Sequence, residues 1–374
     1  MPSSPSRSRF FYRFLQGLTW FSGLYLLIGY VLGYTLWWKH WAVGFWLLAM
    51  PCAMGFMAVL TVIWFLADVR KAWMPFLLVL AGWPFWQRTI GLHSAPEKTP
   101  AGKSLEVITF NVSGFRLDDY FDKHNTSRAE QLLHWFSQTS ADIICVQEAT
   151  SWKSENLPDA FHTTESFARA GYRYMAGEFQ TPPFLTPALQ RMAGVAIFSR
   201  YPVISSANTA FKGSNGINGL VVADIRKGTD TLRVISLHLM SMGVRVGRVM
   251  KATDSRSAKS ETRNILHKLK EGFISHNLEM DPVIKAIRNS PYPVILCGDF
   301  NEVPTGLSYG RARRHLKNSF EEAGRGFGFT LNRSPWFIRI DNQFHSNHFT
   351  VVSHEVVRSV TTSDHFPVRV RYRY

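Results

Sequence analysis

Cysteine is scarce in this sequence: the 374 residues include three, at positions 52, 145 and 297. Three cysteines cannot form the disulfide framework of a small secreted domain, and none stands at a Cys/His spacing typical of a zinc site. Cys52 lies in an apolar N-terminal region, and Cys145 and Cys297 lie within apolar strand patterns. We therefore expect three free thiols that pack like small apolar side chains.

Acidic residues are nearly absent from the first quarter of the chain, where Asp68 is the only acid between residues 14 and 92. The whole chain has 42 Lys and Arg against 27 Asp and Glu, a formal net charge of +15. Residues 1–94 hold seven of these basic residues and one acid, so the remainder keeps 35 basic and 26 acidic residues, a net charge of +9. A basic domain favours anionic partners such as nucleic acid, phosphorylated metabolites or an anionic membrane surface.

Long apolar runs fill the same N-terminal region, at residues 15–38, 41–67 and 73–92. About 20 apolar residues cross a bilayer, so we predict a transmembrane region over residues 1–92 with about three helices. The first run is too long for the core of a signal peptide and no small-residue cleavage pattern follows it. The third run contains Pro75, Pro84 and Arg88, which leaves a re-entrant or interfacial segment as the alternative.

Basic residues in the connecting turns predict the orientation. The N-terminus has three arginines and the turn after the second run has Arg70 and Lys71, whereas the first turn has only Lys39. The positive-inside rule then places the N-terminus and the second turn in the cytoplasm. Three spans make this a multi-pass membrane protein with residues 95–374 on the extracytoplasmic side, whereas two spans would leave them inside.

A polar linker rich in Pro and Gly, residues 93–104, precedes a domain over residues 105–374 in which strand and helix patterns alternate. We predict helices at 127–138, at 255–276 and near 313–323, and a strand hairpin of 219–225 with 231–239. The segment 179–189 has three prolines and is predicted to be a long surface loop.

The domain is organised around residues 294–301, where four apolar residues predict a buried strand that ends at Gly298. Asp299 and Asn301 follow, and alternation along an extended chain sends their side chains to one side. By itself this is equally typical of a turn, because Asp and Asn are common turn residues. The other strand ends favour a functional site over an ordinary turn, because they also carry polar groups. These are Asn111, Glu148, His238, Asp341, Asp364 and His365.

Together these side chains make a coherent chemistry. Glu148 and Asp364 are hard oxygen donors suited to Mg²⁺. His365 is a candidate general base toward water, with Asp341 holding its tautomer, and Asp299 is a candidate to orient that water. The remaining three residues are candidates to donate to phosphoryl oxygens: His238, Asn111 and Asn301.

The order of these motifs resembles the endonuclease/exonuclease/phosphatase superfamily, which includes pancreatic-type deoxyribonucleases, AP endonucleases, neutral sphingomyelinases and inositol polyphosphate 5-phosphatases. The motifs that carry the resemblance are Asn111, Val146-Gln147-Glu148, Ser236-Leu237-His238, Gly298-Asp299-Phe300-Asn301, Arg339-Ile340-Asp341 and Ser363-Asp364-His365-Phe366-Pro367. One departure is Asn342, since the superfamily often has Tyr after that Asp.

The resemblance implies an α/β fold, a four-layer sandwich of two mixed β-sheets flanked by helices. It implies Mg²⁺, or Mn²⁺, at Glu148 with Asp364 and Asn111 nearby. It places Asp299 and Asn301 around the attacking water and a His365–Asp341 pair at the scissile phosphate. His238 stands where the deoxyribonuclease and sphingomyelinase branches have a histidine.

Three functions are compatible with these features. The first is a membrane-anchored, metal-dependent endonuclease, which the net charge and the basic stretch 245–270 favour. The second is a sphingomyelinase-like lipid phosphodiesterase or a phosphatase of phosphorylated small molecules, which the membrane region favours. The third is a non-catalytic binding module, which the intact set of catalytic residues disfavours. The expected partners are thus the membrane and a phosphodiester substrate, nucleic acid or phospholipid, with no obligate protein partner.

Overall fold

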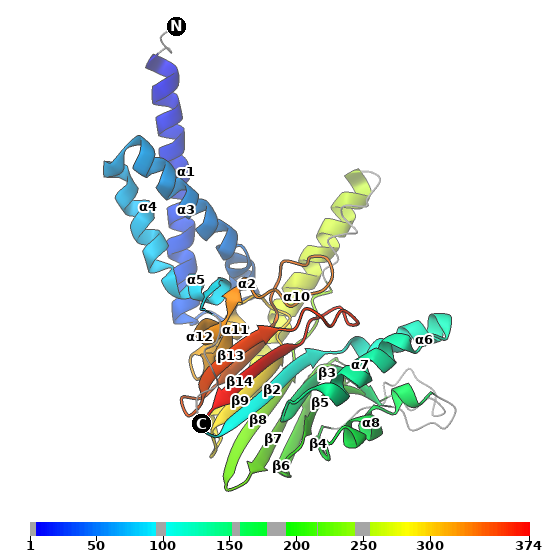
Figure 1. Ribbon diagram of the computed structural model, residues 1–374. Helices are drawn as coiled ribbons and strands as arrows, with labels where there is room; N and C mark the ends of the chain where they lie inside the picture. Colours follow the sequence, from blue (N-terminus) through cyan, green and yellow to red (C-terminus); the bar gives the residue numbers. More distant parts are fainter. Residues whose placement is uncertain (1–4, 95–101, 152–157, 178–191, 215, 244–254) are drawn as a thin grey trace.

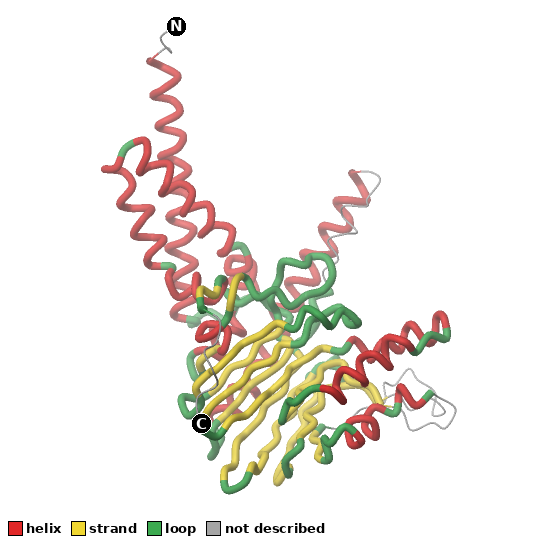
Figure 2. The backbone as a smooth tube through the Cα atoms, viewed as in Figure 1, coloured by secondary structure: helices red, strands yellow, loops and turns green. Residues whose placement is uncertain are grey.

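The computed structural model describes residues 5–94, 102–151, 158–177, 192–214, 216–243 and 255–374 (Figure 1). A group of N-terminal helices stands on one end of a domain built from two β-sheets (Figures 1 and 2). The predicted loop at 179–189 and most of the predicted linker lie outside the described residues. The first long strand of the domain begins at Ser104, the last residue of the predicted linker.

Each of the two large sheets has six strands. The first has the order β13 (Thr350–Val356), β14 (Val368–Arg373), β2 (Ser104–Asn111), β3 (Ile143–Ser151), β5 (Met192–Ser199) and β4 (Tyr174–Ala176). The second has the order β10 (Lys317–Asn318), β12 (Asp341–His345), β9 (Val294–Asp299), β8 (Asp230–His238), β7 (Gly219–Lys227) and β6 (Val203–Ala210). Both sheets are mixed, because β2 pairs with β3, and β8 with β9, in parallel, while their other pairs are antiparallel.

Successive side chains along each strand point to opposite faces of its sheet, and both faces of the central strands are buried. One face packs in the core between the sheets and the other packs on helices. Val107 and Ile295 point into the core between the sheets, where Cys145 and Cys297 also pack as free thiols. Ile108 points outward against helices α7 (Ser127–Gln138) and α8 (Thr163–Arg169). The other sheet packs its outer face on α10 (Ser255–Arg288) and α11 (Leu307–Arg313). The predicted four-layer α/β sandwich is therefore confirmed.

Several shorter elements complete the domain. Two 3-10 turns, Ser113–Arg116 and Asp159–Phe161, and helix α6 (Leu117–Lys123) follow strands of the first sheet. Helix α12 (Ser319–Ala323) precedes β11 (Arg325–Gly326), which pairs with β1 (Gly91–Leu92) directly after the N-terminal helices.

The N-terminal region contains five helices: α1 (Pro5–Thr35), α2 (Trp41–Leu48), α3 (Met50–Ala67), α4 (Val69–Ala81) and α5 (Trp83–Thr89). Two stretches, Arg9–Thr35 and Trp41–Ala67, are long and apolar enough to cross a membrane. The third predicted run is not one helix, because it breaks at Gly82 into pieces of 13 and 7 residues. Cys52 is exposed on α3, which differs from the buried position expected for it.

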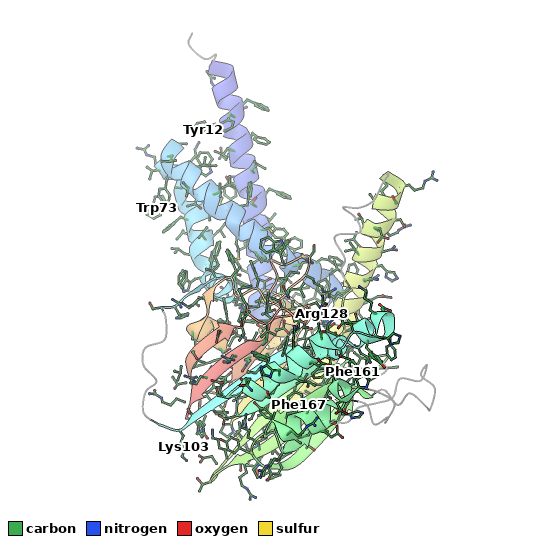
Figure 3. All side chains as sticks on the ribbon, turned by 45° about the vertical axis from the view of Figure 1, so that its right-hand side comes forward. Tyr12, Trp73, Lys103, Arg128, Phe161 and Phe167 are labelled. Carbon is green, nitrogen blue, oxygen red and sulfur yellow. The ribbon has the colours of Figure 1, made fainter. Side chains whose placement is uncertain are left out.

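Large apolar side chains cover the outer faces of these helices, as Figure 3 shows around Tyr12 and Trp73. Leu66 is 86% exposed, Phe21 74% and Trp73 59%. Exposed apolar side chains at this density are unfavourable in water and favourable in a bilayer. The surface of the N-terminal helices therefore indicates membrane association.

The N-terminal helices pack directly on the domain that is built from the two β-sheets. Thr305 donates its hydroxyl hydrogen to the carbonyl oxygen of Leu47 at 2.8 Å, and Leu307 belongs to the apolar core of the N-terminal helices. Lys39 Nζ lies 3.3 Å from Asp281 Oδ1 on α10. The two parts therefore share a core and polar contacts.

Two local predictions need correction, and one strand was not predicted. The helix predicted near 313–323 is two helices, because Lys317 and Asn318 pair with β12 and the Asn318 side chain caps α12. The helix predicted at 255–276 continues to Arg288 through Pro282. Strand β6 was not predicted, because its exposed face is polar and its apolar alternation is weak.

Candidate active site

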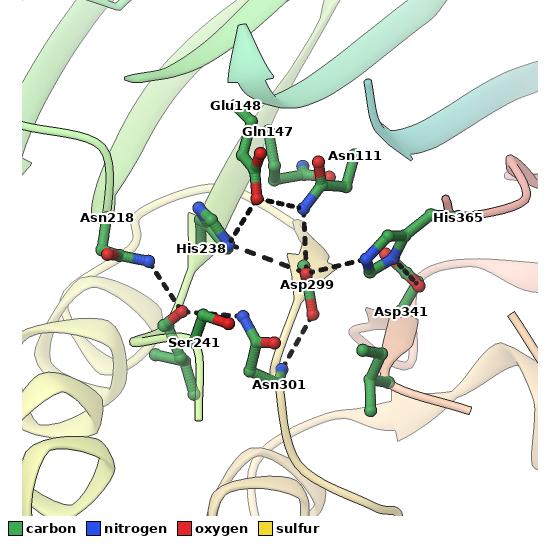
Figure 4. A network of polar contacts seen from close by, with 12 residues as sticks. Asn111, Gln147, Glu148, Asn218, His238, Ser241, Asp299, Asn301, Asp341 and His365 are labelled. Atoms are coloured by element: carbon green, nitrogen blue, oxygen red, sulfur yellow. Dashed lines mark hydrogen bonds and ion pairs between the residues drawn. The ribbon is translucent and has the colours of Figure 1, made fainter. Parts of the chain in front are cut away.

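Strand register brings the predicted residues to one edge of the sandwich. The parallel strands β8 and β9 end side by side, with His238 opposite Asp299. The antiparallel strand β12 begins at that edge, with Asp341 opposite Asp299. In the other sheet, β2 ends at Asn111, which is paired in register with Gln147 of β3. Five strands therefore deliver polar side chains to one place (Figure 4).

Asp299 is the centre of this group. Its Oδ2 atom accepts a hydrogen bond from Asn111 Nδ2 at 3.0 Å and lies 3.7 Å from the Nε2 atoms of both His238 and His365. Its Oδ1 atom accepts from the backbone N–H of Asn301 at 2.8 Å. Gly298 makes this possible, because it has a φ of 144° and a Cβ there would collide with the Leu237 carbonyl.

Glu148 is displaced from the regular strand by a β-bulge. The register of β3 shifts between Val146 and Ala149, and Glu148 has a φ of 51°, a left-handed conformation that is unfavourable for glutamate. Its Oε1 atom accepts from Asn111 Nδ2 at 3.1 Å and lies 3.8 Å from His238 Nε2. Bulges commonly redirect a side chain at a functional site, and here the bulge turns Glu148 toward the group.

His365 and Asp341 form a buried pair. His365 Nδ1 donates to Asp341 Oδ2 at 2.9 Å, so Nε2 is the ring atom that faces Asp299. Burial disfavours the charged imidazole, but the carboxylates Asp341 and Asp299 outweigh it and raise the pKa of His365 to about 10. Thr330 Oγ1 accepts from the backbone N–H of Asp341 at 3.2 Å and fixes the start of β12.

His238 is oriented by a backbone carbonyl. Its Nδ1 atom donates to Ile217 O at 3.3 Å, which leaves Nε2 facing Glu148 and Asp299. That Nε2 atom is buried and makes no hydrogen bond to the part of the chain that the structure describes. A buried polar atom without a partner is costly, so this atom is a natural contact for a substrate or a metal-bound water.

Asn301 lies at the rim of the group. Its side chain donates a hydrogen bond to Leu239 O at 3.0 Å. The side chain of Asn218 donates to the same oxygen at 2.8 Å. Its φ of 47° is left-handed, a region that asparagine tolerates better than most residues. Asn301 therefore holds the turn after His238 against the turn after Asp299.

Asp364, a predicted metal ligand, is paired with an arginine. Its Oδ2 atom accepts from Arg333 Nε at 2.9 Å, an arginine that no sequence pattern marked. Its expected position beside Glu148 stays a prediction. Asn342, which departs from the superfamily pattern, is buried and accepts a hydrogen bond from the buried Arg339 at 2.8 Å.

The surroundings of Glu148 fit a hard divalent cation. Its side chain is 37% exposed and borders a polar cavity of about 430 Å³ that also carries Asp118 and Asp122. Mg²⁺ binds oxygen ligands, keeps several waters and needs such an open, polar site. Asp299, Asp341 and His365 also offer ligand atoms within 4.8 Å of one another, but there Asp341 Oδ2 already accepts a hydrogen bond from His365 Nδ1.

Two residues that the sequence analysis did not identify, His276 and Glu302, form a buried pair next to the site. His276 on α10 bonds through Nδ1 to Glu302 Oε2 at 3.1 Å and through Nε2 to Met240 O at 2.8 Å. Because both neighbours are acceptors, both ring nitrogens carry hydrogen. Burial disfavours that charged form, but Glu302 outweighs it and the pKa of His276 is raised. The ring therefore ties together the turns that follow His238 and Asn301.

Comparison with known proteins assigns the domain. Residues 108–365 match the model of the endonuclease/exonuclease/phosphatase family. Because the match covers more than half of the chain, the protein belongs to this family and is a hydrolase that acts on phosphate ester bonds. The predicted family is thus confirmed. Residues 12–89 match a domain of unknown function (DUF8431).

Several solved structures are similar to this chain at low sequence identity. An endonuclease/exonuclease/phosphatase from Beutenbergia cavernae is 18% identical, with a TM-score of 0.49 and 72% of each chain covered. The human Nocturnin catalytic domain with bound sulfate is 15% identical, with a TM-score of 0.48 over 74% of this chain and 97% of that one. A mannosyl-6-phosphatase from Bacteroides thetaiotaomicron is 15% identical, with a TM-score of 0.47 over 72% of this chain and all of that one. No curated protein sequence matches the chain.

Proposed function

We propose that this protein is a membrane-anchored phosphodiesterase that depends on a divalent metal ion. The observation that carries the proposal is the convergence of two carboxylates, two histidines and an amide on Asp299 or its immediate neighbours, at one sheet edge. Acidic, basic and hydrogen-bond-donating groups within 4 Å of one another are what phosphate ester hydrolysis requires.

Mg²⁺, with Mn²⁺ as the alternative, is assigned to Glu148, with Asn111 and Asp364 beside it. Bound there, the metal ion would neutralise negative charge on the phosphoryl oxygens. The exposed Glu148 carboxylate and the adjacent polar cavity support this position.

The protein's own residues supply the remaining chemistry. Asp299 orients the attacking water, since its Oδ2 atom lies between His238 and His365. His365 exchanges a proton at Nε2, because Asp341 holds the hydrogen on Nδ1. Asn301 stands at the side of the group, where its amide would donate to phosphoryl oxygens as negative charge develops. His238 would donate there from Nε2 as an imidazolium, because its Nδ1 hydrogen is already given to Ile217 O.

We place three membrane passes in residues 1–92. Tyr12 of α1 bonds to Ala67 O at the end of α3, whereas Thr35 lies against Arg314 of the catalytic domain. The chain must therefore return from Ala67 to the domain through α4 and α5. At about 1.5 Å per residue these helices reach about 30 Å, roughly the thickness of the bilayer core. With the arginine-rich N-terminus in the cytoplasm, the catalytic domain lies on the extracytoplasmic side.

Two substrate classes have specific support. The net charge of +9 on the catalytic domain and the exposed basic side chains of α10, which include Lys259, Arg263 and Lys268, favour nucleic acid and hence an endonuclease. The packing of the site-bearing turn at Thr305 on the membrane helix at Leu47 favours a lipid.

The test uses the purified full chain in bilayer nanodiscs, because the N-terminal helices share a core with the catalytic domain. Plasmid DNA, single-stranded RNA and sphingomyelin vesicles are each incubated with Mg²⁺, with Mn²⁺ and with a chelator. We expect metal-dependent cleavage of one substrate class. Cleavage that is equally fast in the chelator would contradict the metal assignment.

A further inference from the structure

An apolar cavity of about 150 Å³ lies beside the candidate active site. Its wall comes from the end of α2, the turn after β8, helix α10 and the loop before β12. The apolar side chains that line it include Leu48, Met242, Leu269, Phe273, Leu331 and Ile338. This apolar cavity is separate from the polar cavity beside Glu148.

The apolar cavity is continuous with the site. Asn301 belongs to its wall. Leu331, also in the wall, forms a β-bridge with His365, and Ile340 immediately precedes Asp341. Arg333 lies at the cavity and bonds to Asp364. The apolar cavity, the Arg333 guanidinium and the candidate active site are therefore neighbours.

The same cavity touches the membrane region. Leu48 lies within the second stretch that is long enough to cross a bilayer. The loop before β12 exposes three aromatic side chains, Phe327 at 51%, Trp336 at 65% and Phe337 at 59%. Figure 1 shows this loop at the same end of the domain as the N-terminal helices. Exposed aromatic rings of this kind favour the interface between lipid and water.

We propose that the cavity binds the hydrocarbon part of a membrane lipid whose phosphate ester is hydrolysed at the adjacent site. This inference rests on the proposed phosphodiesterase function and names its substrate class. A nucleic acid would place polar sugar and phosphate groups against the apolar wall, where they lose hydrogen bonds to water. A hydrocarbon chain gains by leaving water, and its headgroup phosphate meets Arg333 and the site.

The test compares two soluble diesters, methyl and hexyl p-nitrophenyl phosphate, with the full chain in nanodiscs. Each methylene buried in the cavity should lower KM about fourfold, so we expect the hexyl ester to have a KM at least about tenfold lower. Ile338→Trp fills the cavity and should abolish most of this preference. Leu269→Trp is a second filling variant on a different element. Ile204→Trp, at a 44% exposed position on β6, is the matched control and should keep the preference.

Each outcome is decisive. A preference that is lost in both filling variants and kept in the control supports the cavity as the hydrocarbon site. Equal KM values for the two esters, or a preference that survives in both filling variants, overturns it while leaving the phosphodiesterase function intact. If neither ester is hydrolysed with Mg²⁺ or Mn²⁺, the phosphodiesterase proposal itself fails, and this inference fails with it.

Discussion

Thr305 and Leu47 join the catalytic domain to the N-terminal helices through one buried hydrogen bond of 2.8 Å. Thr305 lies four residues after Asn301, and Leu47 lies near the end of α2. The turn that carries the candidate active site is thus held directly by α2, which lies in the second stretch that is long and apolar enough to cross a membrane.

Replacing Thr305 with valine should destabilise this contact. The change keeps the side-chain shape and removes the donor, at a cost of about 1 kcal/mol. We expect a lower midpoint of thermal unfolding for the full chain in detergent. The control is Thr350→Val, at an exposed position on β13, which should leave the midpoint unchanged. A Thr305→Val midpoint equal to that of the control would show that the contact contributes nothing.

Replacing Glu148 with glutamine tests the metal assignment. Glutamine keeps the size of the side chain but loses the negative charge that attracts the cation. The Mg²⁺ concentration for half-maximal activity should rise by about tenfold or more. Glu165→Gln on the exposed face of α8 is the matched control. An unchanged metal dependence in Glu148→Gln would place the ion elsewhere.

Much of the site follows from the sequence because its residues stand at strand ends, which alternating apolar patterns locate well. Helix α7 was predicted at its observed bounds, and the hairpin of β7 and β8 was predicted within two residues. Gly298, Asp299 and Asn301 were identified because a buried strand stops there.

Other features depend on contacts between distant segments. Helix α10 continues through Pro282 because Met280 and Val283 pack on the second sheet, which outweighs the lost backbone hydrogen bond. The pairing of Arg333 with Asp364 spans 31 residues, and that of His276 with Glu302 links a helix to a turn. No local pattern encodes such pairs.

His354 should make the protein less stable in acid. Burial and the nearby Arg339 lower the pKa of His354 to about 3, from an ordinary value of about 6.5. Because the folded state resists protonation, the contribution of neutral His354 is complete above pH 6.5 and is lost as the pH falls toward 3. The residue as a whole is only partly buried, so the loss at pH 5 should be on the order of 1 kcal/mol.

The measurement compares thermal unfolding of the wild type and of His354→Asn at pH 7 and pH 5. Asparagine preserves a polar partner for Ser319 Oγ, which lies 2.9 Å from His354 Nδ1. We expect the wild type to lose more stability between these pH values than the variant does. Equal losses would show that His354 titrates normally in the folded state.

The three-pass topology predicts opposite labelling of two positions. In a Cys52→Ser background, Lys212→Cys on the catalytic domain should react with a membrane-impermeant thiol reagent added outside intact cells. Arg70→Cys, in the first turn of α4 directly after the second stretch, should react only after the cells are opened. The reverse pattern would invert the orientation, and labelling of both from outside would contradict three passes.

Hydrolysis of bis(p-nitrophenyl) phosphate by His365→Asn, measured with the full chain and Mg²⁺ at pH 7.5, tests the central claim most directly. His354→Asn is the matched control, because it makes the same exchange at a histidine on β13, outside the candidate site. We predict that kcat falls by about 10²–10⁴-fold in His365→Asn, with a normal unfolding midpoint, and that the control keeps its activity. A folded His365→Asn variant with the kcat of the wild type would show that phosphate esters are not hydrolysed at this sheet edge.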